Sequence, residues 1–296
     1  MGINKKITAS DIAILAVLLI TALFCLIPML NTLAISFSDK VSAQGGKVFL
    51  WPVNFTTNPY NELLKDAQFF RSFVISVIRV LVGTAINVAI IIVTAFPLSK
   101  QPEVFPAKTR YMWLVIFLML FNAGLIPNYI VVTRLGLTNT IWALVLPGAV
   151  QIFSIIMLMN FYKTSIPHSL EEAALMDGAD PWYILGRIFV PLSKPCIAVV
   201  TLWAAVGHWN SYFDGLIYMN VRENYPLQTY IQSLTVSIDW QNVSGMSGED
   251  IARMMSVSNL TFTSAKVVVS MLPILLFYPF IQRFFVTGIV MGAVKE

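Results

Sequence analysis

The sequence predicts an all-α membrane protein with six transmembrane helices. Of its 296 residues, 57% are hydrophobic and only 11% are charged, whereas soluble domains carry roughly 25% charged residues. The mean hydropathy of the whole chain is +0.75. Several apolar runs also reach the length of about 20 residues that a helix needs to cross about 30 Å of hydrocarbon. We therefore expect residues 1–296 to form a single transmembrane domain.

Six apolar runs are candidates for these helices. They cover residues 12–35, 72–96, 111–132, 141–162, 196–219 and 265–282. The first run follows Lys5 and Lys6, as the apolar part of a signal peptide would. It is too long for a signal peptide, however, and no small-residue cleavage site follows it promptly. We therefore expect it to remain in the protein as the first transmembrane helix.

The distribution of basic residues predicts the orientation. Six spans place both termini on the same side of the membrane, and cytoplasmic loops are enriched in Lys and Arg. With cytoplasmic termini, the inner segments hold ten of the 19 Lys and Arg residues, and the outer segments hold seven. Loop 163–195 then faces the cytoplasm and loop 220–264 faces outward. The basic residues lie in separate short loops rather than in one patch, which argues against a nucleic-acid partner.

Two long outer segments remain, residues 36–71 and 220–264. The second contains the stretch "SIDWQNVSGMSGEDIARMMS", which is rich in Gly, Ser and Asn before it turns helical. Long loops in compact proteins are commonly functional or disordered. Its tip, residues 242–248, could contact a partner or solute, or it could cap the pore without contacting a partner.

The cytoplasmic loop predicts a first short helix that ends at a glycine. Pro167 suits the first turn of a helix, and Ser169 with Glu172 has the spacing of a capping box, in which each side chain bonds to the other's backbone amide. Gly178 can adopt the left-handed conformation that closes a helix. We therefore expect a helix between Pro167 and Gly178.

A second short helix is predicted directly after this turn. Asp180 followed by Pro181 is the usual pair of an N-cap and a first helical residue, so the helix should run over residues 182–190. Pro191 and Pro195 should end it before the next span. The loop is thus expected to be a helix–turn–helix element on the inner face of the membrane.

The residues of this loop allow two interpretations. Trp182 and Tyr183 could anchor an amphipathic hairpin on the lipid headgroups. Alternatively, the small side chains of Ala173 and Ala174 could let the surface of a partner protein approach closely. The first helix is acidic on balance, which suits an anionic inner leaflet poorly. Local chemistry alone leaves both interpretations open.

A spacing motif in the loop resembles a known family. Glu172-Ala173-Ala174 is followed after three residues by Gly178, and after nine more by Ile188, one residue, Val190 and Pro191. This order is similar to the EAA loop of ATP-binding-cassette (ABC) importer permeases, EAA-x3-G-x9-I-x-L-P, with Val190 where Leu is usual. The stretches "FNAGLIPNYIVVTRLGLTNTIWALVLPGAV", "SIPHSLEEAALMDGADP" and "YPLQTYI" extend the resemblance to the maltose-type carbohydrate-uptake permeases, and within them to an oligosaccharide sub-group.

The resemblance implies a type I ABC importer permease in a bacterial-type plasma membrane. Such a chain forms half of a heterodimeric pathway with a second, different permease subunit. A cytoplasmic ATPase dimer would bind ATP and Mg, an extracytoplasmic solute-binding protein would deliver the sugar, and this chain would bind no cofactor or metal. The residues that would couple to the ATPase are Glu172, Ala173, Ala174, Asp177, Gly178, Ile188 and Pro191.

Two further sets of residues are candidates for roles inside the membrane. The stretch "HWNSYFDGLIY" offers the aromatic and hydrogen-bonding groups that sugars bind, so a substrate path could include Trp209, Asn210, Tyr212, Asp214 and Asn122. The maltose resemblance assigns most sugar contacts to the other subunit, and an interfacial aromatic belt would also explain Tyr212. Arg79 and Asp214 lie at similar depth in the second and fifth spans. They could pair, or Arg79 could reach the headgroups while Asp214 touches water.

The sequence argues against several other functions. It lacks the phosphate-binding pattern GxxxxGK[ST] and the catalytic or metal-binding patterns HExxH, CxxC and GxSxG. An intramembrane enzyme should show clustered His, Asp and Glu, and a secondary transporter should place coupling charges near the midplane. We therefore expect a non-catalytic transport subunit. The EAA loop is shared with importers of amino acids, phosphate and metals, so these solutes remain the alternative.

Overall fold

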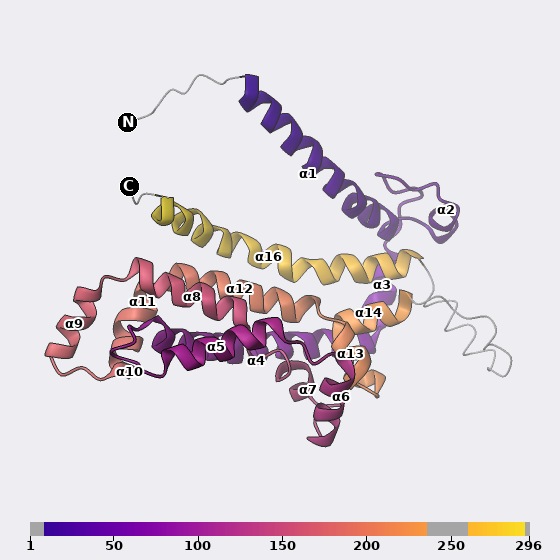
Figure 1. The fold of residues 1–296 in the computed structure, drawn as a ribbon. Coiled ribbons are helices and arrows are strands. Elements are labelled where there is room, and N and C mark those ends of the chain that lie inside the picture. Colours follow the sequence, from indigo (N-terminus) through magenta and orange to yellow (C-terminus); the bar gives the residue numbers. More distant parts are fainter. Residues whose placement is uncertain (1–8, 236–259, 294–296) are drawn as a thin grey trace. The chain divides into compact units, whose positions relative to one another are not determined.

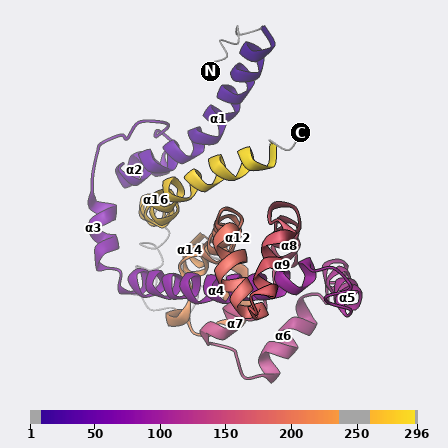
Figure 2. The ribbon, with the colours of Figure 1, turned by 90° about the vertical axis from the view of Figure 1, so that its left-hand side faces the viewer.

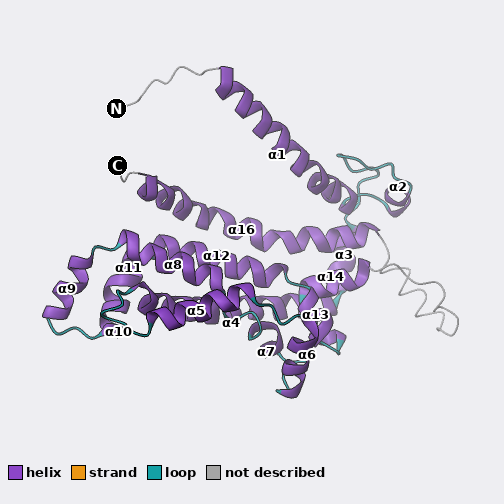
Figure 3. Cartoon of the chain, in the orientation of Figure 1, coloured by secondary structure: helices purple, strands orange, loops and turns teal. Residues whose placement is uncertain are grey.

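The structure is a computed structural model that describes residues 9–235 and 260–293, with the side chains of the last helix described as far as Leu276. Every regular element in these ranges is helical (Figure 3). The chain divides into two compact units, Met1–Ala67 with Ile231–Leu272, and Gln68–Tyr230 with Pro273–Glu296. The predicted tip 242–248 of loop 220–264 lies outside the described residues.

The first unit begins with an apolar helix whose most apolar stretch is not buried within this chain. Helix α1 (Ala9–Ser36) covers the predicted first span, and it is followed by α2 (Lys40–Gln44) and α3 (Asn58–Lys65). Asp39 caps α2. Hydrogen bonds from the Ser42 side chain and the backbone amides of Ser42 and Val41 lower the pKa of this carboxyl. The segment after α2 returns to α1, where Asn31 donates to the Phe49 carbonyl at 2.6 Å.

A buried ion pair fixes the start of the last helix within this unit. Helix α16 (Leu260–Ala293) begins before the predicted span 265–282 and carries Lys266 in its second turn. The Lys266 Nζ lies 2.6 Å from the Asp66 carboxylate, and its side chain is fully buried. The same ammonium lies 4.0 Å from the centre of the Phe262 ring. Since an unpaired buried lysine is costly, this pair specifies where α16 joins the end of α3.

The second unit is built around one long helix, α4 (Ala67–Ser99), which covers the predicted second span. The helices that accompany it are shorter (Figure 1). They are α5 (Lys108–Leu120), α6 (Leu125–Arg134), α7 (Ile141–Val145), α8 (Ile152–Ser165), α12 (Lys194–Asn210), α13 (Phe213–Tyr218) and, as far as Tyr230, α14 (Leu227–Thr235).

Three of the predicted continuous spans are broken in the structure. The predicted span 111–132 consists of α5 and α6, which are bent by 112°, and Figure 2 views α5 nearly along its axis with α6 running across it. Gly124 at this break has φ +85°, and its amide donates to the Asn122 side chain at 2.9 Å. The predicted span 141–162 is interrupted between α7 and α8, and 196–219 is interrupted between α12 and α13.

The breaks change how many helices are long enough to cross a membrane. Among the described residues, Ser10–Ser36 and Ala67–Ser99 are each sufficiently long and apolar. Up to four spans result if each of two bent pairs counts as one, α5 with α6 and the helical stretch Pro181–Leu192 with α12. The count of six spans therefore stays a prediction.

The buried face of α4 is a stripe of small and polar residues. Positions three or four residues apart share one helix face, and here they are Ser72, Ser76, Arg79, Gly83, Asn87, Ile91 and Ala95. Small residues in such a stripe let neighbouring helices approach closely. At Gly83 the approach is especially close, since a Cβ atom there would lie 2.4 Å from Nε2 of His208 on α12.

This contact predicts that Gly83 does not tolerate a methyl group. The His208 ring cannot easily move away, because it is buried and bonded to Asn87. Gly83→Ala should therefore lower the free energy of unfolding by about 1–3 kcal/mol, the usual cost of overpacking. Thermal unfolding of the purified protein in detergent measures this effect. Gly207→Ala on α12 is the control, because its Cβ would meet no atom within 4 Å; equal stability of the two variants would contradict the close approach.

Candidate functional site

The sequence of loop 163–195 forms a helix–turn–helix element at one end of the second unit (Figure 1). Its helices are α9 (His168–Met176), α10 (Pro181–Ile184), the π-helical segment η1 (Leu185–Phe189) and α11 (Val190–Leu192). Gly178 has φ +80° and makes the predicted left-handed turn after α9. The Asp180 carboxylate accepts from the Tyr183 amide at 2.7 Å and so caps α10, as the sequence predicts.

Two local details of this element differ from the sequence prediction. The N-cap of α9 is Pro167, which makes no side-chain capping bond, so the expected capping box of Ser169 and Glu172 is not formed. Pro191 does not end the second helix either, because it lies inside α11. It has no amide hydrogen for the carbonyl four residues earlier, and the wider turn of η1 accommodates it. The helical path instead turns at Ser193, where it bends by 84° into α12.

Helix α9 has an inner and an outer face. Glu172, Ala173 and Asp177 are exposed, so Glu172 is accessible rather than used in a cap. Ala174 is half-buried and packs with Ile188 against the apolar core of the unit. Its small side chain therefore serves the packing of the chain itself, and only Ala173 offers the close approach to a partner that the sequence suggested for both.

The outer face of the element carries large apolar side chains. Leu175, Met176, Trp182 and Tyr183 are exposed, and Met176 retains 88% of its surface. The motif residue Pro191 is exposed, whereas Ile188 and Val190 are partly buried against the core. The element thus combines an apolar outer surface with an inner surface fixed to the rest of the unit.

At the opposite end of the unit, Arg79 and Asp214 are brought together. The Arg79 guanidinium makes two bonds to the Asp214 carboxylate, one from Nη1 at 3.2 Å and one from Nη2. Arg79 retains only 2% of its surface, so it does not extend to solvent in this chain. The pair therefore joins α4 to α13, which is the pairing alternative that the sequence left open.

Arg79 also binds backbone groups at the helix breaks. Its Nη1 donates to the Ser211 carbonyl between α12 and α13 at 3.2 Å, and its Nη2 donates to the Leu144 carbonyl of α7 at 3.4 Å. The Ser211 hydroxyl in turn donates to Asp214 at 2.8 Å. One arginine thus supplies bonds to two interrupted helices.

Asn87 has the same role about two turns further along α4. Its Nδ2 donates to the carbonyls of Gly148 and Ala149, between α7 and α8, at 2.9 and 2.8 Å. Its Oδ1 lies 2.7 Å from Nε2 of His208. The sequence alone does not reveal which helix break Asn87 serves, because its partners lie about 60 residues away in sequence.

The residues of the candidate substrate path do not form one cluster. Trp209 is buried and packs edge-on against Phe73. The Asp214 carboxylate is paired with the Arg79 guanidinium. Asn210 and Tyr212 are exposed beside the α12–α13 break. Asn122 is exposed at the α5–α6 break, where its side chain caps the turn.

Comparison with known proteins identifies the family, although no protein-family model matches the chain. A polygalacturonan/rhamnogalacturonan transport system permease protein from Bacillus subtilis, YtcP, is 36% identical over 288 residues, which cover 96% of this chain and 98% of the relative. This chain belongs to the carbohydrate ABC-importer permeases. A melibiose/raffinose/stachyose import permease protein, MelC, from the same organism is 24% identical over 264 residues, covering 87% of this chain and 88% of MelC.

A solved structure also matches this permease. It is the crystal structure of a bacterial ABC transporter involved in the import of the acidic polysaccharide alginate, with a TM-score of 0.83 and 30% identity. The match covers 94% of this chain and 98% of that chain. The permease is thus a non-catalytic membrane subunit, and its family works with an ATPase and a binding protein.

The turn at Gly178 predicts a test of the loop's geometry. A β-branched residue in the left-handed conformation costs about 1–2 kcal/mol, so Gly178→Val should displace α9 relative to α10. We expect the permease to insert into the membrane normally and transport to fall severalfold. Uptake in cells measures this effect, with membrane insertion followed in parallel.

Gly186→Val is the matched control for this variant. Gly186 lies in the same loop, its φ is not in the left-handed region, and its Cβ would meet no atom within 4 Å. Normal uptake by Gly178→Val, or equal losses in both variants, would mean that the turn geometry does not matter for transport.

The Arg79–Asp214 pair predicts non-additive mutations. Removing one partner leaves the other charge without compensation, which in buried pairs costs about 3–5 kcal/mol. Part of Asp214 remains exposed, so the lower end of this range is expected. Arg79→Ala and Asp214→Ala should each reduce stability or basal ATPase activity of the assembled transporter, and the double variant should lose less than the sum. Strictly additive losses in a double-mutant cycle would argue against the pair.

Proposed function

We propose that this permease forms one half of a heterodimeric pathway that imports an oligosaccharide. A second, different permease subunit supplies the other half. The observation that carries the proposal is the structure of the α9–α11 element, which has an exposed apolar outer face and an inner face packed on the transmembrane helices. This is the arrangement that a docking element needs if it is to transmit movement from an ATPase to the membrane.

The coupling residues divide between the two faces of this element. Glu172, Ala173, Asp177 and Pro191 are exposed and would contact the ATPase, with Met176 and Trp182 supplying apolar area around them. Gly178 would fix the angle between α9 and α10, and Ile188 would hold the second helix on the core. ATP and Mg would be bound by the ATPase dimer. The α9–α11 end of the unit would accordingly face the cytoplasm, together with both termini.

The substrate class follows from two of the similar proteins. One is named for polygalacturonan and rhamnogalacturonan, and the solved transporter imports the acidic polysaccharide alginate. Oligosaccharides released from acidic polysaccharides are therefore the first substrates to test. Neutral oligosaccharides such as raffinose are the second, because MelC is named for them.

The α12–α13 break would lie beside the sugar path. Asn210 and Tyr212 are exposed there and offer a planar amide and an aromatic ring, and Asn122 would contribute from the α5–α6 break. Trp209 and Asp214 would act indirectly, by holding this region on α4. The Arg79–Asp214 pair would keep the outer end closed until a loaded binding protein docks, through contacts that include loop 220–264.

Reconstitution tests the proposed function. The permease should be expressed with its partner permease, the ATPase and the binding protein, and the complex placed in vesicles loaded with ATP. We expect uptake of labelled oligosaccharide that requires all components and is abolished by an ATPase variant unable to hydrolyse ATP. Uptake by vesicles that contain this permease alone would contradict the proposal, because the chain would then be a complete transporter.

A further inference from the structure

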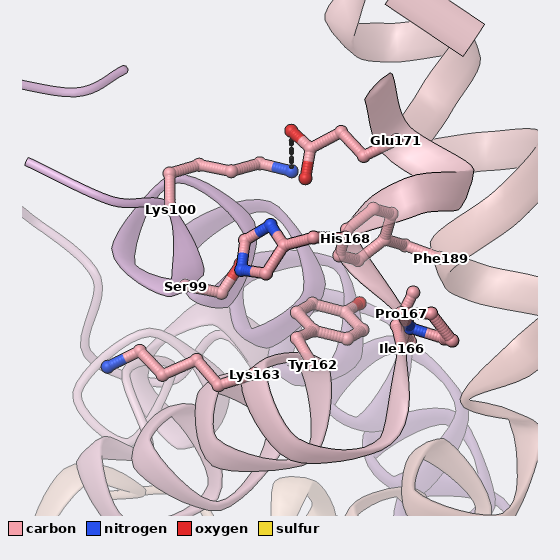
Figure 4. Close-up of a pocket in the computed structure, with 9 residues that line it drawn as sticks. All are labelled: Ser99, Lys100, Tyr162, Lys163, Ile166, Pro167, His168, Glu171 and Phe189. Atoms are coloured by element: carbon pink, nitrogen blue, oxygen red, sulfur yellow. Dashed lines mark hydrogen bonds and ion pairs between the residues drawn. The ribbon is translucent and has the colours of Figure 1, made fainter. Parts of the chain in front are cut away.

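Lys100 directly follows the last residue of α4, and its side chain contacts loop 163–195, which carries α9–α11 and is called the coupling loop below. Its ammonium lies 2.6 Å from the carboxylate of Glu171 on the inner face of α9. Figure 4 shows the two side chains reaching toward each other, with Phe189 beneath them. Both are largely buried, with 8% of the Lys100 side chain and 12% of the Glu171 side chain exposed. The pair therefore joins two elements that are 71 residues apart in sequence.

The Lys100 ammonium also lies against two aromatic rings. Its Nζ is 3.9 Å from the centre of the Phe96 ring and 4.1 Å from that of Phe189. The two rings pack edge to face at 4.9 Å, and Phe189 packs similarly on Tyr162 of α8. Because a cation is attracted to the face of an aromatic ring, Lys100 contacts α4, α9 and η1 at once.

The backbone of Lys100 is held as well. Lys108, at the start of α5, donates from its ammonium to the Lys100 carbonyl. Burial lowers the pKa of the Lys100 ammonium, while its hydrogen bond and charge interaction with Glu171 oppose this shift. A buried pair of this kind contributes little net stability compared with apolar side chains of similar size. Its benefit lies in specifying one arrangement of the elements it joins.

We infer that Lys100 is a positioning residue that fixes the coupling helix α9, through Glu171, to the end of α4. This inference rests on the proposed function, since it assigns how movement of the coupling loop reaches the membrane. Arg79 lies 20 residues before Ser99, the last residue of α4, which corresponds to about 30 Å of helix. The two pairs therefore connect the coupling loop and the α12–α13 break through a single continuous helix.

This inference is tested by the amount of oligosaccharide taken up per ATP hydrolysed, rather than by the yield of assembled complex. The complete transporter should be purified with Lys100→Met or Glu171→Gln, and oligosaccharide uptake measured per ATP hydrolysed. We expect this ratio to fall by about fivefold or more, the lower end of typical coupling between sites. Basal ATP hydrolysis per assembled complex should be retained. A residue that only stabilised the fold would lower the yield of complex without changing the ratio.

Three further variants separate a positioning role from a loss of folding. Lys100→Arg keeps a cation and should keep most of the coupling. The exchange Lys100→Glu with Glu171→Lys restores a charge pair but places a carboxylate against the two phenylalanine faces, so it should remain uncoupled. Glu103→Gln, which neutralises an exposed carboxylate in the α4–α5 connection, is the control for Glu171→Gln and should behave as the wild type.

The outcomes distinguish this inference from the proposed function. A wild-type complex that imports no oligosaccharide would overturn the proposed function before any variant is compared. A wild-type complex that does import it, together with an unchanged ratio in Lys100→Met and Glu171→Gln, would overturn the positioning role alone. Full coupling in the exchanged pair would also overturn it, because the aromatic contacts of the Lys100 cation would then be irrelevant.

Discussion

The second unit depends on one constraint, which is that backbone groups released by broken helices need hydrogen-bond partners. A membrane offers no water to satisfy them, so irregular backbone is tolerated only where protein groups do so. The polar stripe of α4 provides these groups. Asn87 donates to Gly148 and Ala149, Arg79 donates to Ser211 and Leu144, and the Ser76 hydroxyl accepts from the Leu227 amide at 2.7 Å. Helix α4 is continuous, and the helices around it are interrupted where its side chains can bind them.

This constraint also explains why charged residues occur in so apolar a helix. Arg79 would be costly if it faced lipid, but here it bonds to a carboxylate and to two carbonyls. The same helix ends at Ser99, and the next residue, Lys100, forms a second pair that holds α9. The α4 helix is thus linked to the two features that an ATP-driven permease has to connect. Near its C-terminal end lies the element that would contact the ATPase, and at Arg79 lie the broken helices beside the proposed sugar path. A continuous helix can transmit movement between them without any change in its own hydrogen bonds.

The sequence predicted the features that depend on local pattern. The uninterrupted runs of α1 and α4 follow from hydropathy, the turn at Gly178 follows from the conformational freedom of glycine, and the cap at Asp180 follows from side-chain chemistry. The family followed from the spacing that begins at Glu172. These signals are all contained in short stretches, and the structure and the comparisons agree with them.

The remaining features depend on contacts between distant residues, and local pattern does not contain them. Hydropathy averages over the breaks in 111–132 and 196–219, because the residues on both sides are equally apolar. Glu171 and Glu172 are adjacent and carry the same charge. Only the rotation of α9 about its own axis decides that Glu171 faces Lys100 while Glu172 is exposed. The expected capping box of Ser169 and Glu172 is not formed, and the reason here is local. The helix begins one residue before Ser169, and Pro167 at its N-cap offers no side-chain acceptor.

The central claim is that α4 carries both ends of the second unit as one rigid element. It is tested most directly by spin labels on Ser169 of α9 and Leu216 of α13, both exposed, after replacing Cys25 and Cys196. Pulsed electron–electron double resonance on the assembled transporter would measure the distance between the two labels in the nucleotide-free state and in the ATP-bound state. We predict one narrow distance distribution that is the same in both states, and that broadens when Lys100→Met is introduced. A distribution that shifts or splits in the otherwise wild-type protein when ATP binds would contradict the claim.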